Sequence, residues 1–511
     1  MKLYTKLLEI LEAHDVNHIF GVPGDAINPL LEALRKQDSI KYIHVAHEES
    51  GAMAASSSAK LTGKLQVCAG TVGPGAIHLL NGLYDAKKDH APVLAIVGQV
   101  PSQYIGSDYH QEVNLPVLFQ DVADYITEIQ NPEQMPDVAI EACNSAVANH
   151  SVSVLVIPYD VGQKDVPDLP VTAITHDLLS PLSPQDNRIE EAVEKINNAE
   201  HISLFVGEGA RGSRDQVLKL AEQLQAPIIF SLKAKDIIPY DHPNTAGGLG
   251  LLGSRAGVRA MDDCDLVLML GSDFPYKEWF NHDGDVIQVD RRASVVGRRR
   301  PGAVAIHSDV GPAVEALLAK LQPRSSADFL QGIQKVKKEW DAFLHEQEAV
   351  DRSKNVVHPQ AVAATLSELT GPDTIFTCDT GEVTVWGARH LYLKKNQRFT
   401  LAFNLATMAY AMPASIGTQC AYPNRQVISL SGDGGFNMLM GDFLTAVKYK
   451  LPIKVVVFNN GKLGLIKMEQ ESEGYPEHET GLQNPDYAAL ASAMGGHGFR
   501  VKGPAELKSV L

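Results

Sequence analysis

A chain of 511 residues, 44% of them hydrophobic, is long enough for about three ordinary domains with full cores. Its formal charge of −16 argues against nucleic-acid binding, because a phosphate backbone requires a basic surface. No stretch approaches the roughly eighteen apolar residues of a membrane span, and residues 1–16 resemble an amphipathic helix rather than a signal peptide. We therefore expect a cytoplasmic protein. Its five cysteines, without a CxxC pair, are expected to be reduced core residues.

Residues 1–160 alternate helix-like and strand-like runs, which is typical of a doubly wound parallel α/β domain. The expected strands are 18–22, 41–45, 65–70, 92–98 and 153–158. Residues 160–184 are rich in Pro and Asp without periodicity, so we interpret them as a linker.

Two further α/β domains are expected at residues 184–322 and 356–511. The strands predicted for the middle domain are 202–206, 227–230, 266–270 and 286–289, and those for the last domain include 426–430 and 453–458. The fold class is thus α/β, with three doubly wound parallel-sheet domains.

The last domain carries the strongest motif of the chain. Gly432-Asp433-Gly434 follows one predicted strand, and Asn459-Asn460 follows the next. In an open parallel sheet this edge binds ligands: glycines admit a phosphate closely, while Asp433 and Asn460 offer the oxygen ligands that Mg²⁺ prefers. A lone Gly-Asp-Gly is more often a tight turn, and the pairing of the two motifs is what favours a site.

This pair resembles the signature of thiamine-diphosphate (ThDP) enzymes. The resemblance implies that Asp433, the Asn460 side chain and the main-chain carbonyl of Lys462 hold Mg²⁺ against the cofactor's diphosphate. It also implies cofactor contacts by further residues of the last domain: Ala406, Thr407, Met408, Gly432, Gly434, Gly435, Gly464, Leu465 and Ile466.

Residues 403–413 (FNLATMAYAMP) resemble the family segment in which a bulky side chain bends the cofactor. Met408 matches that side chain, and Ala406 matches the carbonyl that accepts the cofactor's amino group. The alternative is that Met408 is an ordinary core methionine.

The first domain resembles the matching half of a ThDP site through HVAHEESGAMAA and TVGPGAIHLLNGLYDA. The match places Glu48 as the carboxyl that contacts the cofactor's pyrimidine ring and helps to move its proton. The alternative is a solvated acid at a helix start, since acids stabilise helix N-termini.

Segments of the middle domain resemble the flavin-binding segments of pyruvate oxidases, although each alone is a weak Gly-rich turn. The glycines would admit the pyrophosphate, Arg211 would pair with it, and Asp290 would accept a ribose hydroxyl. The FAD contacts implied by the resemblance are Gly207, Gly209, Arg211, Leu251, Gly253, Ser254, Phe274, Pro275, Tyr276, Asp290, Arg292 and Asp309.

The whole chain is similar to the pyruvate oxidase family, homotetramers that decarboxylate pyruvate oxidatively to acetyl phosphate or acetate and pass electrons through FAD to oxygen or quinone. The alternative is a carboligase like acetolactate synthase, whose FDDR-like segment is replaced here by Phe274-Pro275-Tyr276-Lys277. A non-catalytic flavoprotein is disfavoured by the joint presence of Glu48, Asp433 and Asn460.

Several positions depart from the oxidase pattern. Ala46 stands where an Arg is common, Thr380 where Val is usual, and Leu465 where an aromatic is usual. His110 and Gln111 occupy the substrate loop, where the family carries FQ, and we expect them to contact the substrate carboxylate or the acyl acceptor; simple ring packing by His110 is the alternative. Family members also continue beyond Leu511 into a tail that binds membrane in quinone-linked members, so peripheral membrane contact would depend on such a tail.

Overall fold

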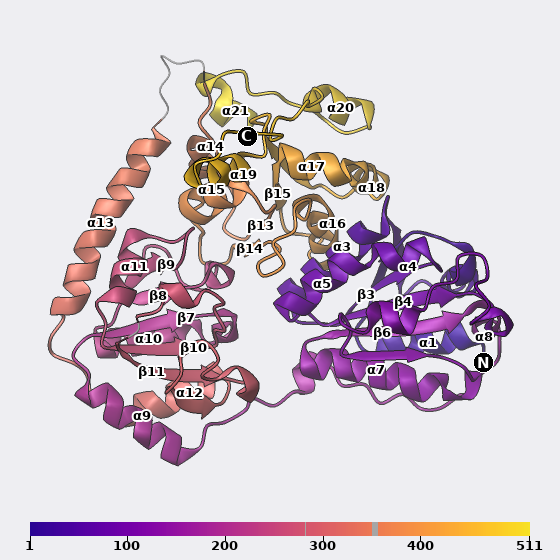
Figure 1. Cartoon of the computed structure of the whole chain (residues 1–511), viewed down its shortest axis with the longest axis horizontal. Coiled ribbons are helices and arrows are strands. Elements are labelled where there is room, and N and C mark those ends of the chain that lie inside the picture. Colours follow the sequence, from indigo (N-terminus) through magenta and orange to yellow (C-terminus); the bar gives the residue numbers. More distant parts are fainter. Residues whose placement is uncertain (282, 350–355) are drawn as a thin grey trace. The chain divides into compact units, whose positions relative to one another are not determined.

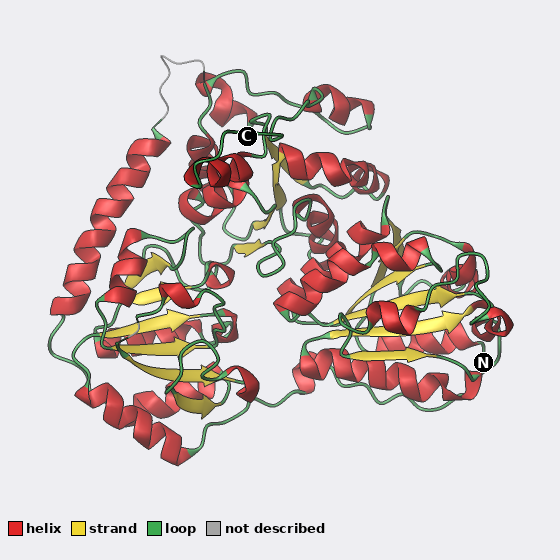
Figure 2. Cartoon of the chain, in the orientation of Figure 1, coloured by secondary structure: helices red, strands yellow, loops and turns green. Residues whose placement is uncertain are grey.

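The computed structural model describes residues 1–281, 283–349 and 356–511. Three sheets flanked by helices make up the chain (Figures 1 and 2). The residues divide into two compact units. The first comprises residues 1–179, 374–384 and 400–500, and the second comprises residues 180–373, 385–399 and 501–511.

The first sheet has the strand order β2-β1-β3-β4-β6-β5, with parallel pairing throughout. Its strands are β1 (His18–Gly21), β2 (Lys41–His44), β3 (Gln66–Gly70), β4 (Val93–Gln99), β5 (Tyr125–Glu128) and β6 (Val152–Pro158). The accompanying helices are α1 (Leu3–Ala13), α2 (Asn28–Leu34), α3 (Glu48–Thr62), α4 (Pro74–His78), α5 (Leu80–Asp89), α6 (Leu115–Phe119), α7 (Met135–Asn149) and α8 (Tyr159–Gly162).

Strand β4 shows why this sheet is covered on both faces. Leu94 and Ile96 belong to the core that α1 and α7 cover, whereas Val93, Ala95 and Val97 belong to the core that α3 and α5 cover. Successive side chains of a strand point to opposite faces, so a fully apolar strand requires helices on both sides.

The second sheet has the order β12-β11-β10-β7-β8-β9 and is also parallel. Its strands are β7 (Ile202–Val206), β8 (Ile228–Phe230), β9 (Thr245–Gly248), β10 (Leu266–Leu270), β11 (Asp285–Asp290) and β12 (Val304–His307). The helices of this part are α9 (Asp186–Asn198), α10 (Arg214–Leu224), α11 (Arg255–Asp262), α12 (Val310–Lys320) and α13 (Asp328–Glu348).

The third sheet has the order β14-β13-β15-β16, with β13, β15 and β16 paired in parallel. Its strands are β13 (Ile375–Cys378), β14 (Arg398–Thr400), β15 (Val427–Gly432) and β16 (Lys454–Phe458). The helices are α14 (Pro359–Leu369), α15 (Glu382–His390), α16 (Ala411–Ala421), α17 (Asp433–Leu439), α18 (Phe443–Lys448), α19 (Gly464–Ser472), α20 (Tyr487–Ala493) and α21 (Leu507–Val510).

The predicted fold class of three parallel α/β domains is confirmed, and the predicted strands lie within a few residues of the observed ones. Five short strands, β5, β9, β12, β13 and β14, were not among those predicted. Strand β9 contains two glycines, and β5 is only half-buried, so neither shows a clear apolar pattern. The predicted domain boundaries stay a prediction. Among the described residues, none of the helices combines the length and the apolar run needed to cross a bilayer.

Candidate active site

The two halves of the strongest motif lie at adjacent strand ends. Strands β15 and β16 are neighbours, and Gly432 is aligned with Phe458 at their carboxyl ends. Asp433 therefore begins α17 beside the loop that contains Asn460. Asp433 is buried, with an exposed fraction of 3%, while Asn460 is exposed. This edge brings one carboxylate and one amide together, as expected for parallel strands.

Asp433 is oriented by residues that the sequence reading did not single out. Its Oδ2 accepts hydrogen bonds from the Gly461 main-chain N–H at 2.7 Å and from Asn484 Nδ2 at 2.6 Å. Asn484 also donates to Asn459 Oδ1 at 2.9 Å. Asn484 lies in an irregular segment, and no local pattern distinguishes it from other asparagines.

Asn460 has a carboxylate partner, Glu382, that was likewise missed. Asn460 Nδ2 donates to Glu382 Oε2 at 2.6 Å, while its Oδ1 accepts from the Lys462 N–H at 3.0 Å. A Cβ atom on Gly464 would lie 2.0 Å from Glu382 Oε2, so a larger residue there would displace this carboxylate. Glu382 thereby directs the Asn460 amide so that its oxygen faces Lys462.

The donor set at this edge fits a hard divalent cation. A carboxylate (Asp433), an amide oxygen (Asn460) and the main-chain carbonyl of Lys462 are oxygen ligands of the type that Mg²⁺ prefers. Close packing leaves little room at Gly434, where a Cβ atom would meet Leu463 Cδ2 at 2.9 Å and Met408 Cε at 3.2 Å. Glycine at position 434 therefore lets Met408 and Leu463 pack directly against the first turn of α17.

The segment that carries Ala406, Thr407 and Met408 has an unusual backbone. Ala406 and Ala409 adopt left-handed conformations, with φ of 58° and 62°. Such conformations are unfavourable for residues with a Cβ atom and occur where the surroundings enforce them. Thr407 Oγ1 accepts a hydrogen bond from Asn81 Nδ2 at 2.9 Å. The segment is therefore held in a strained shape beside the Gly434 backbone.

A buried charge cluster holds the start of this segment. Lys60 Nζ lies 2.6 Å from Asp89 Oδ2 and 2.7 Å from Asp85 Oδ2, and it donates to the Leu401 carbonyl at 3.1 Å. Asp89 accepts hydrogen bonds from the Phe403 N–H at 3.1 Å and from Asn404 Nδ2 at 2.7 Å. Burial raises the pKa of Asp85 to about 6, although Lys60 opposes this shift. We call Lys60, Asp85 and Asp89 the charge clamp.

Asp379 holds the other end of the segment. Its Oδ1 accepts a hydrogen bond from the Ala411 N–H at 2.7 Å, and a Cβ atom on Gly435 would lie 2.4 Å from its Oδ2. Burial raises the pKa of the Asp379 carboxyl to about 7. The neighbouring Thr380 hydroxyl is buried without a hydrogen-bond partner in the part of the chain that the structure describes.

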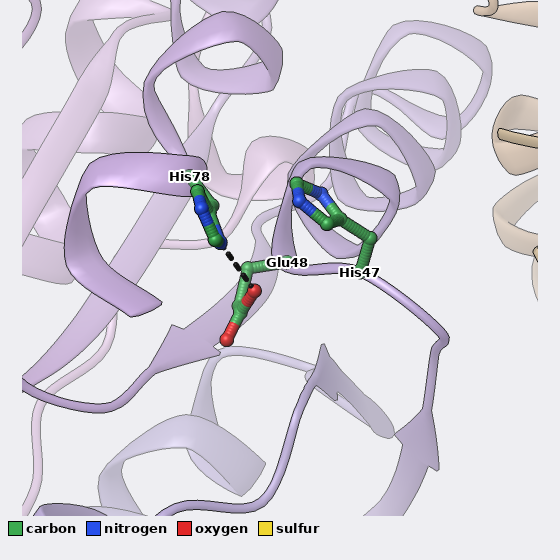
Figure 3. A group of neighbouring side chains, drawn as sticks. All are labelled: His47, Glu48 and His78. Atoms are coloured by element: carbon green, nitrogen blue, oxygen red, sulfur yellow. Dashed lines mark hydrogen bonds and ion pairs between the residues drawn. The ribbon is translucent and has the colours of Figure 1, made fainter. Parts of the chain in front are cut away.

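Glu48 is the first residue of α3, where His47 caps the helix by accepting from the Glu49 N–H. The Glu48 side chain is mostly buried, and its Oε2 lies 3.0 Å from His78 Nδ1 (Figure 3). The His47 and His78 rings stack with centroids 4.4 Å apart. The HEE motif does not predict that His78, at the end of α4, contacts Glu48.

His110 and Gln111 lie on an exposed loop. The Glu112 carboxylate holds this loop by accepting from the Gly106 and Tyr109 N–H groups at 2.5 and 3.0 Å. Gln111 has a φ of 64°, and a Cβ atom on Gly73 would lie 2.8 Å from its carbonyl oxygen. The loop therefore lies against the turn that starts α4, the helix of His78. Substrate contacts by His110 and Gln111 stay a prediction.

The remaining departures from the family pattern are also located. Ala46 donates its main-chain N–H to Asp442 Oδ1 at 2.8 Å. Leu465 and Ile466 lie in the first turn of α19, half-buried and exposed respectively. Their expected contact with a cofactor stays a prediction.

The residues predicted for FAD lie in the second unit, mostly at carboxyl ends of neighbouring strands. Gly207 follows β7, Gly271 follows β10, and Asp290 ends β11. Gly207 and Gly209 pack so tightly on Gly271 that Cβ atoms would lie 2.3 and 2.7 Å from its atoms. Exposed Leu251 and Tyr276 add apolar surface. The set fits a dinucleotide laid along a strand-end edge.

Arg211, Phe274, Asp290 and Asp309 have partners of their own. Arg211 Nη2 contacts Glu208 Oε2 at 3.0 Å and Asp236 Oδ1 at 2.7 Å, so its pairing with a pyrophosphate stays a prediction. Phe274 packs on other aromatic rings, Asp290 accepts from the Arg292 N–H, and Asp309 accepts from the Leu182 N–H. Ser254 caps α11 between Gly253 and Arg255, and Pro275 is exposed.

Three parallel α/β domains, with a carboxylate and an amide at adjacent strand ends, are features of an enzyme that binds a diphosphate cofactor through a divalent cation. Sequence comparisons agree. Residues 1–118 match the N-terminal TPP binding domain of thiamine pyrophosphate enzymes, residues 189–317 match their central domain, and residues 379–511 match their C-terminal TPP binding domain.

Full-length relatives give the same result. YdaP of Bacillus subtilis, whose name describes a thiamine pyrophosphate-containing protein, is 39% identical over 98% of this chain and 87% of its own length. Pyruvate oxidase of Lactiplantibacillus plantarum is 33% identical over 99% of this chain and 85% of its own. The large subunit of acetolactate synthase isozyme 2 of Escherichia coli is 32% identical over 99% and 92%.

The chain belongs to the thiamine pyrophosphate enzyme family. It is an enzyme of the group that uses ThDP to act on 2-oxo acids.

Proposed function

We propose that this protein is a ThDP- and FAD-dependent oxidase that decarboxylates pyruvate and releases an acetyl product, as acetyl phosphate or acetate. The observation that carries the choice of an oxidase is the segment Phe274-Pro275-Tyr276-Lys277, which lacks the arginine typical of the carboligases. In its place Tyr276 is exposed, at 53%, beside the buried Phe274 ring. The similarity to a pyruvate oxidase over 99% of the chain supports the proposal.

Within this proposal each polar group has a role. Asp433, Asn460 and the Lys462 carbonyl hold Mg²⁺, with Glu382 and Asn484 fixing the two side chains. When bound, ThDP would supply the carbanion chemistry and FAD would supply a two-electron acceptor. Glu48 would hold a proton for the pyrimidine ring, Met408 would pack against the cofactor, and His110 with Gln111 would orient the substrate carboxylate.

The same resemblance leads us to propose a cytoplasmic homotetramer. Light scattering of the cofactor-loaded protein measures its mass directly, and a monomer of 55.4 kDa would contradict this assembly.

Anaerobic mixing of the loaded enzyme with pyruvate tests the reaction. Rapid and complete bleaching of the flavin absorbance is expected. The matched control is Glu48→Gln, whose flavin should bleach with pyruvate more slowly by a factor on the order of 10² to 10⁴ but at the normal rate with dithionite. Absence of bleaching in the wild-type enzyme, with dithionite still effective, would rule out the oxidase.

A carboligase is the second candidate, because acetolactate synthases match this chain over a similar share and at similar identity, 30 to 32%. This function predicts that two molecules of pyruvate give acetolactate without flavin bleaching. Measuring acetolactate and flavin absorbance in the same reaction separates the two candidates.

A further inference from the structure

His47, Glu48 and His78 form a cluster of side chains that could ligate a metal ion (Figure 3). His47 caps α3, Glu48 begins it, and His78 ends α4. Each residue offers one nitrogen or oxygen atom, and these atoms lie within 4.8 Å of one another. Two imidazoles and one carboxylate are a common ligand set for transition metals.

Small movements would complete a coordination site. His78 Nδ1 and Glu48 Oε2 are already 3.0 Å apart, whereas ligands about 2.1 Å from a tetrahedral ion lie roughly 3.4 Å from each other. The widest separation between ligand atoms, which is no more than 4.8 Å, must therefore contract by at most about 1.4 Å. The His47 and His78 side chains are 37% and 41% exposed, so both rings have room to turn.

The surrounding charges favour a cation. Besides Glu48, the Glu49 Oε2 atom lies 3.9 Å from His47 Nδ1. The buried Asp442 carboxylate accepts a hydrogen bond from the Ala46 N–H, directly before His47. Because His47 Nδ1 accepts from the Glu49 N–H, these carboxylates act by electrostatic attraction of the cation rather than by a hydrogen bond to that ring nitrogen. The N-terminal end of α3 carries a partial positive charge that repels a cation, but the carboxylates of Glu48, Glu49 and Asp442 outweigh it.

We propose that His47, Glu48 and His78 bind a transition-metal ion such as Zn²⁺ or Co²⁺, and that this ion inhibits the enzyme by occupying Glu48. Imidazole ligands select these ions over Mg²⁺, which favours the all-oxygen ligands around Asp433. The inhibitory consequence rests on the proposed role of Glu48 in ThDP chemistry, whereas metal binding itself does not depend on that role.

Binding is tested with cofactor-free protein in excess Mg²⁺, which competes with Co²⁺ for the oxygen ligands of the Asp433 edge. Titration with Co²⁺, followed by its visible absorption, should show one saturable site per chain. The variants His47→Ala and His78→Ala should each weaken binding at least about tenfold, the lower limit for losing even a supporting partner of a metal ligand. The matched control is His478→Ala, which changes a histidine that is 82% exposed and should leave the affinity unchanged.

Circular dichroism of each variant separates lost binding from lost folding. Equal Co²⁺ affinity in wild type and in folded His47→Ala and His78→Ala, or no saturable binding by wild type, would overturn the site. Because this titration contains no ThDP, its result is independent of whether the proposed oxidase reaction is correct.

Inhibition is tested separately with the loaded enzyme. Micromolar Zn²⁺ should lower turnover, and a zinc chelator added with excess Mg²⁺ should restore it. Turnover unchanged at Zn²⁺ concentrations that saturate the site would refute the inhibitory role.

Discussion

The Asp89→Asn variant tests how the charge clamp supports the segment that carries Met408. This change keeps the shape of the side chain and removes its charge. In the native protein, Asp89 Oδ2 contacts Lys60 Nζ at 2.6 Å and Oδ1 accepts from Asn404 Nδ2 at 2.7 Å. An amide keeps one acceptor and turns the other into a donor, so one of these two contacts becomes donor against donor.

The structure sets the size of the effect. Losing one hydrogen bond costs about 1 kcal/mol, and reducing a charge-assisted bond to a neutral one costs about 1 to 2 kcal/mol more. The left-handed backbones of Ala406 and Ala409 each store about 1 to 3 kcal/mol. The lost clamp energy is comparable with this strain, so the segment should relax. If the whole loss of about 2 to 3 kcal/mol in clamp interaction energy is transmitted to the cofactor site, ThDP binding weakens roughly 30-fold to 150-fold.

Fluorescence quenching by ThDP in saturating Mg²⁺ measures this Kd. Asp177→Asn, which changes an exposed aspartate, is the matched control and should bind normally. Asn404→Ala removes the hydrogen bonds from Asn404 Nδ2 to Asp89 Oδ1 and to the Lys88 carbonyl, and it should weaken binding about fivefold to 30-fold. If Asp89→Asn lowered the melting temperature but left the Kd unchanged, the clamp would serve packing alone and the reasoning would be wrong.

Three further predictions concern single carboxyl groups. Glu48→Gln should keep ThDP bound but lower turnover by a factor on the order of 10² to 10⁴, the range for a lost acid–base group, and unchanged steady-state activity would exclude its proton role. Asp433→Ala should abolish Mg²⁺-dependent ThDP binding in calorimetry, because a hard anionic ligand is lost; tight binding by this variant would contradict the metal site. Burial raises the pKa of Asp379 to about 7, so the native state holds this proton while the unfolded chain releases it near pH 4. The stability that this group contributes is present at low pH and decreases, by on the order of 4 kcal/mol, as the pH rises to about 7. Asp379→Asn should therefore flatten the fall in melting temperature between pH 5 and pH 7.5, and an unaltered profile would show that this carboxyl does not govern it.

The pattern of the sequence predicted the features that depend on neighbouring residues. Apolar runs such as residues 93–97 identify buried parallel strands, because covered sheets need both faces apolar. Gly432-Asp433-Gly434 and Asn460 follow such strands, so their meeting at one edge follows from parallel pairing. Glu48 was located by its motif alone.

The partners of these residues were decided by the tertiary structure alone. Asn484 on Asp433, Glu382 on Asn460 and His78 on Glu48 join segments 51, 78 and 30 residues apart. Asp89 likewise reaches Asn404 over 315 residues. A single polar residue carries no local signal of which distant group it will bond, because that choice depends on how the helices and sheets pack. Short motifs therefore predict which residues form the site, whereas the packing of helices and sheets determines which distant groups orient those residues.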